Sequence, residues 1–252
     1  MMTDARLAAR LAAEAGELLL RIRDETSREP VRDPRALGRR GDAESNALIV
    51  RTLAEHRPGD AVLSEESADD PKRLRASRVW IVDPLDGTRE YGLGRPDWTV
   101  HVALWQAGIG ITAAAVAQPD SGLVMSTDEP RKSSSQLPGK KKRILVSNTR
   151  PPEFAKKVAE EVDAELVPMG SAGAKALAVA RGEADAYVHA GGQYEWDSAA
   201  PVGVARSVGL HASRVDGSEL SYNGVSPYLP DLLICRPELA EPLLRAIARW
   251  RD

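Results

Sequence analysis

Cysteine is almost absent from this sequence: Cys235 is the only one among 252 residues. A single thiol excludes an intramolecular disulfide and any metal site built from several thiolates. The histidines do not suggest a zinc site either, because their spacing is unlike that of zinc ligands, and we expect them to be structural or exposed. They are His56, His101, His189 and His211. The low cysteine content is typical of a reducing environment, so we expect a cytoplasmic protein.

Long apolar runs and an excess of either charge are also missing. The N-terminal stretch ARLAARLAAEAGELLLRIRDE (5–25) is interrupted by Arg and Glu throughout, which is not the pattern of a targeting segment. No other stretch is long and apolar enough to suggest a bilayer span. The formal net charge is −3, and a balance so near neutral gives no general field for nucleic acid or membranes. We therefore expect neither as a partner.

Two common catalytic signatures are absent as well. The sequence has no G-x-x-x-x-G-K-[ST] phosphate loop and no G-x-S-x-G nucleophile turn, so neither mechanism has support. The basic run GKKKR (139–143) adjoins a segment rich in Ser, Pro and Gly, and it has no aromatic neighbours for base stacking. We interpret it as a solvated loop. Aromatic residues make up only 4% of the chain, so Leu, Val, Ile and Ala must supply most of the core.

What is present suffices for a sizeable core, because hydrophobic residues make up 42% of the chain. The first helix is expected to bury one face, formed by Leu7, Leu11, Ala15, Leu18 and Ile22. Residues 27–41, rich in Pro, Arg and Gly, indicate a loop or irregular hairpin. A second helix is predicted to begin at Asp42, a good N-cap residue, and to end near 57–60. Its apolar stripe would consist of Ala43, Ala47, Val50 and Ala54.

Strand and helix patterns divide the rest of the chain into two halves. In the first half, strands are predicted at the start of 61–67 and at 78–82, 98–106, 111–119 and 122–127. The polar segment 128–143 is the expected seam. In the second half, strands at 143–147, 164–169, 184–189 and 231–236 alternate with helices in 152–162, 172–182 and 197–209. We therefore predict an α/β protein with an N-terminal α+β half (1–135) and a C-terminal α/β half (136–252).

The segment VWIVDPLDGTREY (79–91) begins as a buried strand and ends in a cluster of charge. Pro84 holds Asp83 in an extended conformation and should end the strand there. Asp83 and Asp86 can then point into one space, where carboxylates are natural ligands for a hard cation such as Mg2+. The main-chain carbonyl of Leu85, between them, offers another oxygen.

Other polar groups follow predicted strands. After the two aspartates, Gly87 leaves backbone N–H groups open to an anion, and Thr88 has a hydroxyl that can orient a water. Glu65 follows the first predicted strand, and Asp197 opens a predicted helix. Taken singly, each acidic residue is explained by an ordinary turn, a solvated surface or a helix cap. Together they would form a pocket whose like charges repel one another unless divalent cations neutralise them.

Three segments resemble the signature segments of the inositol monophosphatase superfamily, which are Mg2+-dependent, lithium-sensitive phosphatases. They are LSEES (63–67), WIVDPLDGTREY (80–91) and EWDSAAPVGVARSVG (195–209). They occur in the family's order, and the resemblance covers nearly the whole chain. It implies a layered α-β-α-β-α sugar-phosphatase fold, an active site in the cleft between the two halves, and a homodimer. It also implies two or three Mg2+ ions per site, with lithium competing for one position.

Carried over to matching positions, the resemblance assigns roles to single residues. The implied metal ligands are Glu65, Asp83, the Leu85 carbonyl, Asp86 and Asp197. Thr88 becomes the hydroxyl that orients the attacking water, and Asp42 becomes its carboxylate partner. The implied catalytic group is therefore Thr88, Asp42, Glu65 and Asp83. This chain reads LGRRGD (37–42) where the family usually has a V-T-x-A-D-like segment, so helix capping stays open as another role for Asp42.

Within the superfamily, the chain is most similar to the bisphosphate nucleotidase branch, the CysQ-like enzymes. DGTREY (86–91) resembles that branch's D-G-T-K-E-F. The resemblance implies removal of the 3'-phosphate of adenosine 3',5'-bisphosphate, or of its sulfated analogue, in sulfate assimilation. Such a substrate needs a second anion site, although VSNTRPP (146–152) lacks the basic, His-containing form often found there in the nucleotidases. The expected substrate contacts are Gly87, Thr88, Arg89, Ser147, Ser171 and Lys175.

Three alternatives remain open from the sequence. The same chemistry could act on inositol monophosphate or fructose 1,6-bisphosphate. A glycoside hydrolase could use Glu65 and Asp83 as its acid and base. A catalytically silent metal-binding or regulatory protein could have kept the same fold.

Overall fold

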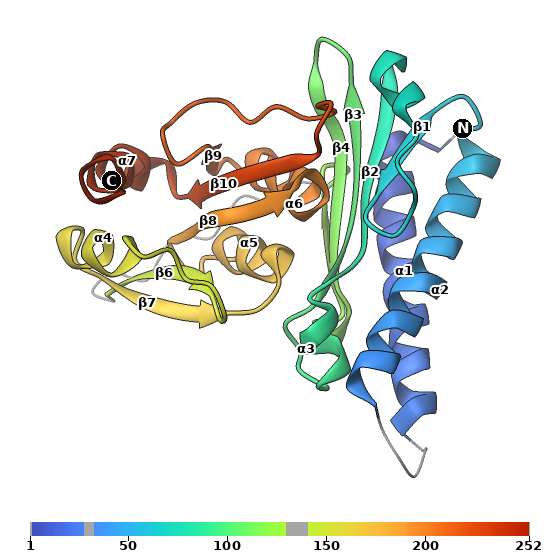
Figure 1. Ribbon diagram of the computed structural model, residues 1–252, viewed down its shortest axis with the longest axis horizontal. Helices are drawn as coiled ribbons and strands as arrows, with labels where there is room; N and C mark the ends of the chain where they lie inside the picture. Colours follow the sequence, from blue (N-terminus) through green and yellow to red (C-terminus); the bar gives the residue numbers. More distant parts are fainter. Residues whose placement is uncertain (1, 28–32, 130–140, 252) are drawn as a thin grey trace.

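The computed structural model describes residues 2–27, 33–129 and 141–251. Helices and sheets alternate in layers (Figure 1): α1 and α2 cover the outer side of one sheet, α5 and α6 lie between the two sheets, and α4 and α7 pack beyond the second sheet. This is the predicted α/β fold with its layer order α-β-α-β-α. Among the helices of the described ranges, none has both the length and the apolar character needed to cross a membrane.

The elements lie within a few residues of most predicted positions. The helices are α1 (Asp4–Ser27), α2 (Pro34–His56), α3 (Thr88–Gly92), α4 (Ala155–Glu161), α5 (Ala172–Ala180), α6 (Glu195–Ser207) and α7 (Pro237–Trp250), with 3-10 turns at η1 (Pro71–Arg75) and η2 (Pro119–Ser121). The first sheet contains β1 (Ala61–Ser64), β2 (Arg78–Asp86), β3 (Thr99–Gln106), β4 (Gly110–Gln118) and β5 (Leu123–Ser126). The second contains β6 (Lys142–Ser147), β7 (Ala164–Met169), β8 (Ala186–Tyr194), β9 (His211–Ser213) and β10 (Tyr228–Cys235). Helices α3 and α7 and strand β9 were not predicted from the sequence.

The start of α2 corrects the sequence analysis, because this helix begins at Pro34 rather than at Asp42. Asp33 caps it by accepting a hydrogen bond from the Arg35 N–H at 2.9 Å, and proline is well suited to the first helical turn. The predicted loop 27–41 is therefore helical from Pro34 on, while residues 28–32 lie outside the described ranges. Gly41 lies within this helix, where we expected a loop, and a Cβ there would lie 2.9 Å from a methyl group of Leu19, so the close approach of α1 favours glycine at this position.

The predicted apolar stripe of α2 is also wrong. Ala43, Ala47 and Ala54 are exposed, and Val50 is only half-buried. The buried face instead includes Ser45, Ile49, Thr52 and Leu53. The prediction for α1 holds better, since Leu7, Leu11, Ala15 and Ile22 are buried, although Leu18 is half-exposed and Leu19 is buried in its place.

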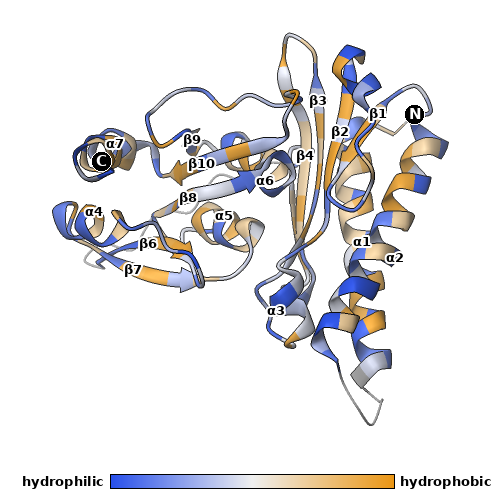
Figure 2. Ribbon diagram, viewed as in Figure 1, coloured by the Kyte–Doolittle hydropathy of each residue, from blue (hydrophilic) through white to orange (hydrophobic). Residues whose placement is uncertain are grey.

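Strand β2 is buried on both faces, as its apolar run predicted. Trp80 and Val82 pack in the core beneath α1 and α2, whereas Val79 and Ile81 pack against the layer that contains α5 and α6. Figure 2 shows hydrophobic residues along β2 and hydrophilic ones on the short helix α3 that follows it. In the first sheet β2 lies between β1, which pairs with it as far as Val82, and β3, which pairs with it to Asp86.

Pro84 does not end β2, which corrects a second expectation. The strand continues to Asp86, and its pairing with β3 shifts register between Asp83 (opposite His101) and Asp86 (opposite Thr99). In a regular strand, residues three apart point to opposite faces. The extra residue at this bulge lets Asp83 and Asp86 approach the same space, and proline is tolerated there because a bulge leaves a residue unpaired.

The second sheet has the order β7-β6-β8-β10-β9. Its first three strands run parallel, and β10 and β9 are antiparallel to their neighbours. Lys142 and Arg143, predicted to belong to the solvated loop 139–143, instead open β6. The predicted boundary between the two halves, 135/136, lies outside the described residues, so the division of the chain there stays a prediction.

Candidate active site

Three aspartates that are far apart in the sequence meet where β2 ends and α6 begins. Asp83 and Asp86 come from the bulged end of β2, and Asp197 comes from the first turn of α6. Each offers a carboxylate oxygen, and these oxygens all lie within 4.8 Å of one another. The sequence predicted this convergence.

A cavity of about 320 Å³ opens beside the three aspartates. Glu65, Asp86, Gly87 and Asp197 contribute to its lining, whereas Asp83 is almost completely buried. Glu65 is more exposed than the aspartates and follows β1, the parallel neighbour of β2. The predicted acidic residues therefore share one region of the molecule.

The carboxyl groups are crowded enough to resist ionisation. Burial raises the pKa of Asp83 well above its ordinary value, and the charges of Glu65 and Asp86 raise it further. Desolvation and the charges of Asp197 and Asp86 raise the pKa of Glu65 to about 8. Burial, followed by the charge of Asp86, raises the pKa of Asp197 to about 6. Because all these donors are carboxylate oxygens, they fit a hard divalent cation, which would relieve their repulsion.

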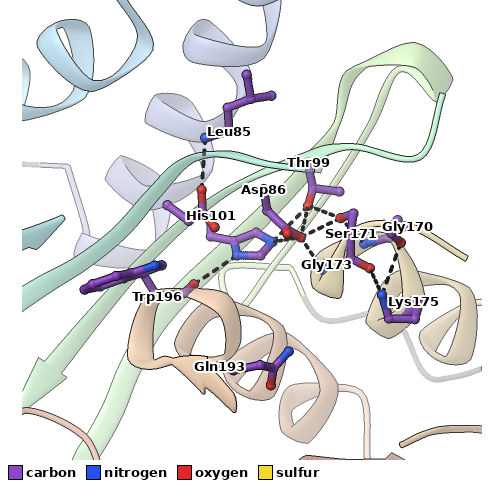
Figure 3. A network of polar contacts seen from close by, with 12 residues as sticks. Leu85, Asp86, Thr99, His101, Gly170, Ser171, Gly173, Lys175, Gln193 and Trp196 are labelled. Atoms are coloured by element: carbon purple, nitrogen blue, oxygen red, sulfur yellow. Dashed lines mark hydrogen bonds and ion pairs between the residues drawn. The ribbon is translucent and has the colours of Figure 1, made fainter. Parts of the chain in front are cut away.

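Asp86 differs from its neighbours because hydrogen-bond donors surround it. Its Oδ2 accepts hydrogen bonds from Ser171 Oγ at 2.5 Å, from the Gly173 N–H at 2.8 Å and from Thr99 Oγ1 at 3.1 Å (Figure 3). Burial alone would raise its pKa, but the nearby His101 and these hydrogen bonds hold the pKa well below the ordinary value. Asp86 is therefore the member of the group most readily ionised.

The raised pKa values predict how the stability of the metal-free protein depends on pH. A carboxyl whose pKa is raised by folding binds more protons in the native state than in the unfolded state, so its contribution is lost as pH rises through the folded pKa. Asp42 (pKa about 7) and Glu65 (pKa about 8) lose protons in the neutral range, and Asp83, whose pKa is also raised, acts in the same direction. Lys175, with a pKa lowered to about 8, acts in the opposite direction but is a single group.

Thermal unfolding in EDTA should therefore show a lower melting temperature at about pH 8 than at about pH 7. We expect a fall of about 2–4 °C or more, which corresponds to about 1 kcal/mol for a chain of this size. Added Mg2+ should raise the melting temperature, and by more at the higher pH, where fewer protons must be displaced. A metal-free melting temperature that stays constant or rises over this interval would contradict the crowding of these carboxyls.

Thr88 and Asp42 form a pair next to the acidic residues. Asp42 lies inside α2 and is only 8% exposed, so it does not cap that helix. Its Oδ1 lies 3.3 Å from Thr88 Oγ1, which also lies 3.1 Å from the Leu85 carbonyl oxygen. Burial and the charge of Glu66 raise the pKa of Asp42 to about 7. The geometry thus joins the predicted hydroxyl to its predicted carboxylate partner.

Two glycines allow this close packing. Gly87 has φ +90°, in the left-handed region, and it starts the turn that carries Thr88. Gly38, in α2, faces the Thr88 side chain, and a Cβ at that position would lie 2.6 Å from Thr88 Cγ2. A larger residue at position 38 would displace the threonine, and one at position 87 would strain the turn that carries it.

The predicted substrate contacts separate into two regions. Gly87, Ser147, Ser171 and Lys175 line the cavity beside the acidic residues. Arg89 does not. Together with Thr88 it lines a neighbouring cavity, because its side chain leaves α3 on the exposed side. Contact of Arg89 with a substrate therefore stays a prediction.

The polar side chains of the predicted second anion site have partners within the protein. Lys175 is buried, and its Nζ donates to the carbonyl oxygens of Met169, Gly170 and Ser171 at 3.3, 3.2 and 2.5 Å. An ammonium has only three protons to donate. Ser147 Oγ accepts hydrogen bonds from two backbone N–H groups that follow it in the chain. Contact of these side chains with a substrate phosphate stays a prediction.

The sequence analysis overlooked several groups in this region. Arg150, exposed, lines the cavity, and its guanidinium makes no hydrogen bond or ion pair within the described ranges. Tyr194, also at the cavity, is 46% exposed and stacks on Trp196 with 4.8 Å between ring centroids. His101, treated as structural, lies against Asp86. Only the position of Arg150 in VSNTRPP (146–152), beside Ser147, could have singled it out.

Comparison with known proteins adds an independent observation. The sequence profile described as "Inositol monophosphatase family" matches residues 3–249. The chain belongs to this family. The resemblance noted in its three signature segments is thereby confirmed, and metal dependence is a property of the family.

Several proteins with named activities are similar to this chain over almost its full length. A protein of Mycobacterium leprae named 3'-phosphoadenosine 5'-phosphate phosphatase is 51% identical, covering 98% of this chain and 94% of its own. A protein of the same name from Mycobacterium bovis is 53% identical, covering 94% of this chain and 91% of its own. The crystal structure of CysQ from Bacteroides thetaiotaomicron has a TM-score of 0.76 and 25% identity, covering 92% of this chain and 97% of that one.

Proposed function

We propose that this protein is a Mg2+-dependent phosphatase that removes the 3'-phosphate of adenosine 3',5'-bisphosphate, yielding AMP and phosphate. The sulfated analogue is a second proposed substrate, and sulfate assimilation is the proposed setting. The convergence of Asp83, Asp86 and Asp197 beside a cavity supports the chemistry. The names of relatives that are 51–53% identical support the choice of substrate. A cytoplasmic location and a homodimer belong to the same proposal.

Five oxygen donors would hold the metal. They are the carboxylates of Glu65, Asp83, Asp86 and Asp197 and the main-chain carbonyl of Leu85. The protein surrounds the buried members with backbone and helix ends, so their positions are fixed before substrate arrives. When bound, two or three Mg2+ ions supply positive charge to the phosphoryl oxygens and to the leaving alkoxide.

Thr88 and Asp42 would orient the attacking water. A threonine hydroxyl has one proton to donate and lone pairs that accept. Thr88 can give that proton to Asp42 or to the Leu85 carbonyl while its oxygen accepts a hydrogen bond from a water. Asp42, whose pKa is raised to about 7, is close to the value that suits a general base at neutral pH. Proton removal from the water would therefore follow the path from Thr88 to Asp42.

A comparison of specificity constants tests the proposed substrate. Phosphate release should be measured with adenosine 3',5'-bisphosphate, inositol 1-phosphate and fructose 1,6-bisphosphate under the same Mg2+ concentration. We expect the largest kcat/KM with the adenosine bisphosphate. A clear preference for inositol phosphate would end the nucleotidase assignment, and an absence of phosphate release from a broad panel of esters would favour a non-catalytic protein.

Arg150 offers a test of how the second phosphate is held. Its exposed guanidinium lies at the cavity and has no partner in the described chain, so it is free to bind a phosphate. Arg150→Ala should raise the KM for adenosine 3',5'-bisphosphate by roughly tenfold, which corresponds to about 1.4 kcal/mol. The KM for 3'-AMP, which lacks the 5'-phosphate, should change little.

Steady-state kinetics with both substrates gives this comparison. Arg245→Ala is a matched control, because Arg245 is exposed on α7, lies outside the cavity and pairs with Glu241 of the same helix. An equal rise in KM for the two substrates, or no rise for either, would show that Arg150 does not recognise the second phosphate.

A further inference from the structure

His101 lies between Asp86, at the end of β2, and the first turn of α6, which carries Asp197. It is fully buried in β3. Its Nδ1 lies 3.0 Å from the carbonyl oxygen of Trp196, and its Nε2 lies 2.9 Å from Thr99 Oγ1 and 3.3 Å from Asp86 Oδ2 (Figure 3). A carbonyl oxygen only accepts, so Nδ1 must carry a proton. One imidazole therefore joins the end of β2, through Asp86, to the first turn of α6.

These contacts leave one oxygen of Asp86 available. Oδ2 faces the hydroxyls of Thr99 and Ser171, the Gly173 N–H and the imidazole. Oδ1 makes no hydrogen bond with any residue of the described ranges. The network thus fixes the rotation of the carboxylate, with one oxygen held by the protein and the other free for a cation.

The other end of the imidazole acts on Asp197. Trp196, whose carbonyl accepts from His101, immediately precedes Asp197 in the first turn of α6. That turn is fixed further by the Tyr194 N–H, which donates to Asp197 Oδ2 at 2.7 Å. The imidazole thus contacts both Asp86 and the turn that carries Asp197.

The packing leaves His101 no alternative position. A Cβ added to Gly173, at the start of α5, would lie 2.2 Å from His101 Nε2 and 2.3 Å from Thr99 Oγ1. Elements β2, β3, α5 and α6 therefore all converge on this side chain. Such crowding is what holds a ligand-supporting group in a single geometry.

We propose that His101 is a positioning residue, which sets the distance between the Asp86 and Asp197 carboxylates and thereby the affinity for the divalent cation. This inference rests on the metal site of the proposed function. The proposed role gives His101 no direct contact with substrate or metal. A histidine of purely structural value would stabilise the fold without changing metal affinity.

Three substitutions separate the contacts of the imidazole. His101→Phe fills the volume and removes both hydrogen-bonding nitrogens. His101→Asn can still reach the Trp196 carbonyl with its amide N–H, and His101→Gln can still reach Thr99 and Asp86. Binding of Mn2+ to the purified full-length protein, measured by calorimetry and by the electron paramagnetic resonance of free Mn2+, gives the readout independently of activity.

We expect His101→Phe to weaken Mn2+ binding by about 10- to 100-fold, the usual cost of losing a partner of a metal ligand. The Asn and Gln variants should each lie between the Phe variant and the wild type. At saturating Mg2+ the variants should recover most of their kcat, with the loss appearing in the Mg2+ concentration needed for half activation. His211→Asn is the matched control, because His211 lies on the edge strand β9, away from the cavity.

The outcomes are distinguishable. If folded His101→Phe binds Mn2+ within fivefold of the wild type, the positioning role is wrong, even if its melting temperature falls. If the Phe variant does not fold, the Asn and Gln variants decide, and unchanged affinity in both overturns the proposal. If the wild type itself does not bind Mn2+, the metal site fails and the proposed function fails with it.

Discussion

Asp83→Asn should lower kcat/KM by on the order of a thousandfold or more, because it removes a charge placed between the other metal ligands. Asp83 is 1% exposed and lies within 4.8 Å, oxygen to oxygen, of both Asp86 and Asp197. Asparagine preserves the size of the side chain, and its amide oxygen can still accept the hydrogen bond from the Leu85 N–H, which is 3.0 Å long in the native protein. The substitution therefore changes charge with little change in shape.

The same variant should be more stable than the wild type when no metal is present. Burial and like charges disfavour the ionised form of Asp83. A neutral amide removes this unfavourable electrostatic interaction, which the wild type keeps for metal binding. Thermal unfolding in EDTA should give a higher melting temperature for Asp83→Asn. This combination, lower activity with higher metal-free stability, cannot arise from misfolding.

A control with another aspartate tests whether any lost carboxylate has the same effect. Asp60 precedes β1 and hydrogen-bonds Arg78 and Trp80, outside the cavity beside the acidic residues. Asp60→Asn should keep kcat/KM within about threefold of the wild type, although its lost ion pair should lower the melting temperature. If Asp83→Asn retained more than a tenth of the wild-type activity, the metal-ligand role of Asp83 would be wrong.

Removal of divalent cations should have an effect of similar size. With EDTA in excess, phosphate release from adenosine 3',5'-bisphosphate should fall by about a thousandfold or more, since the charge that neutralises the phosphoryl oxygens is lost. Mg2+ added beyond the chelator should restore it. The assay should be run near neutral pH, where Asp42, with a pKa of about 7, is partly ionised.

Chelation also separates the proposed function from a rival class. A glycoside hydrolase that used Glu65 and Asp83 as acid and base would need no metal. Full phosphate release in excess EDTA, unchanged when Mg2+ is added, would exclude the metal-dependent phosphatase mechanism. Wild-type protein dialysed without chelator is the control for loss of activity during handling.

The parts of the site that could be predicted are those marked by residue type at the ends of strands. Asp83 and Asp86 lie at the end of β2 and Asp197 lies in the first turn of α6, and their like charge would be costly without a shared cation. The layer order was implied by the family resemblance, whereas the mixed α/β class was predictable because apolar strand runs, such as the start of β2, alternate with helical patterns. Local sequence carries both signals.

The parts that could not be predicted depend on packing between distant segments. Gly41 lies in a helix where a Cβ would crowd Leu19 and Tyr91, and the bulge at Pro84 appears in the pairing with β3. Lys175 resembles an exposed helical lysine in sequence, yet its ammonium binds three backbone carbonyls. His101 gains its importance from the start of α6, about a hundred residues away, which no local pattern indicates.

The most direct test of the account is a crystal structure of the protein grown with Mn2+ and phosphate, measured at a wavelength where manganese scatters anomalously. We predict an anomalous peak in contact with carboxylate oxygens of Asp83, Asp86 and Asp197, with the phosphate beside it in the cavity that Glu65 lines. Manganese bound elsewhere, or a phosphate bound in the cavity while the three aspartates hold no metal, would contradict it.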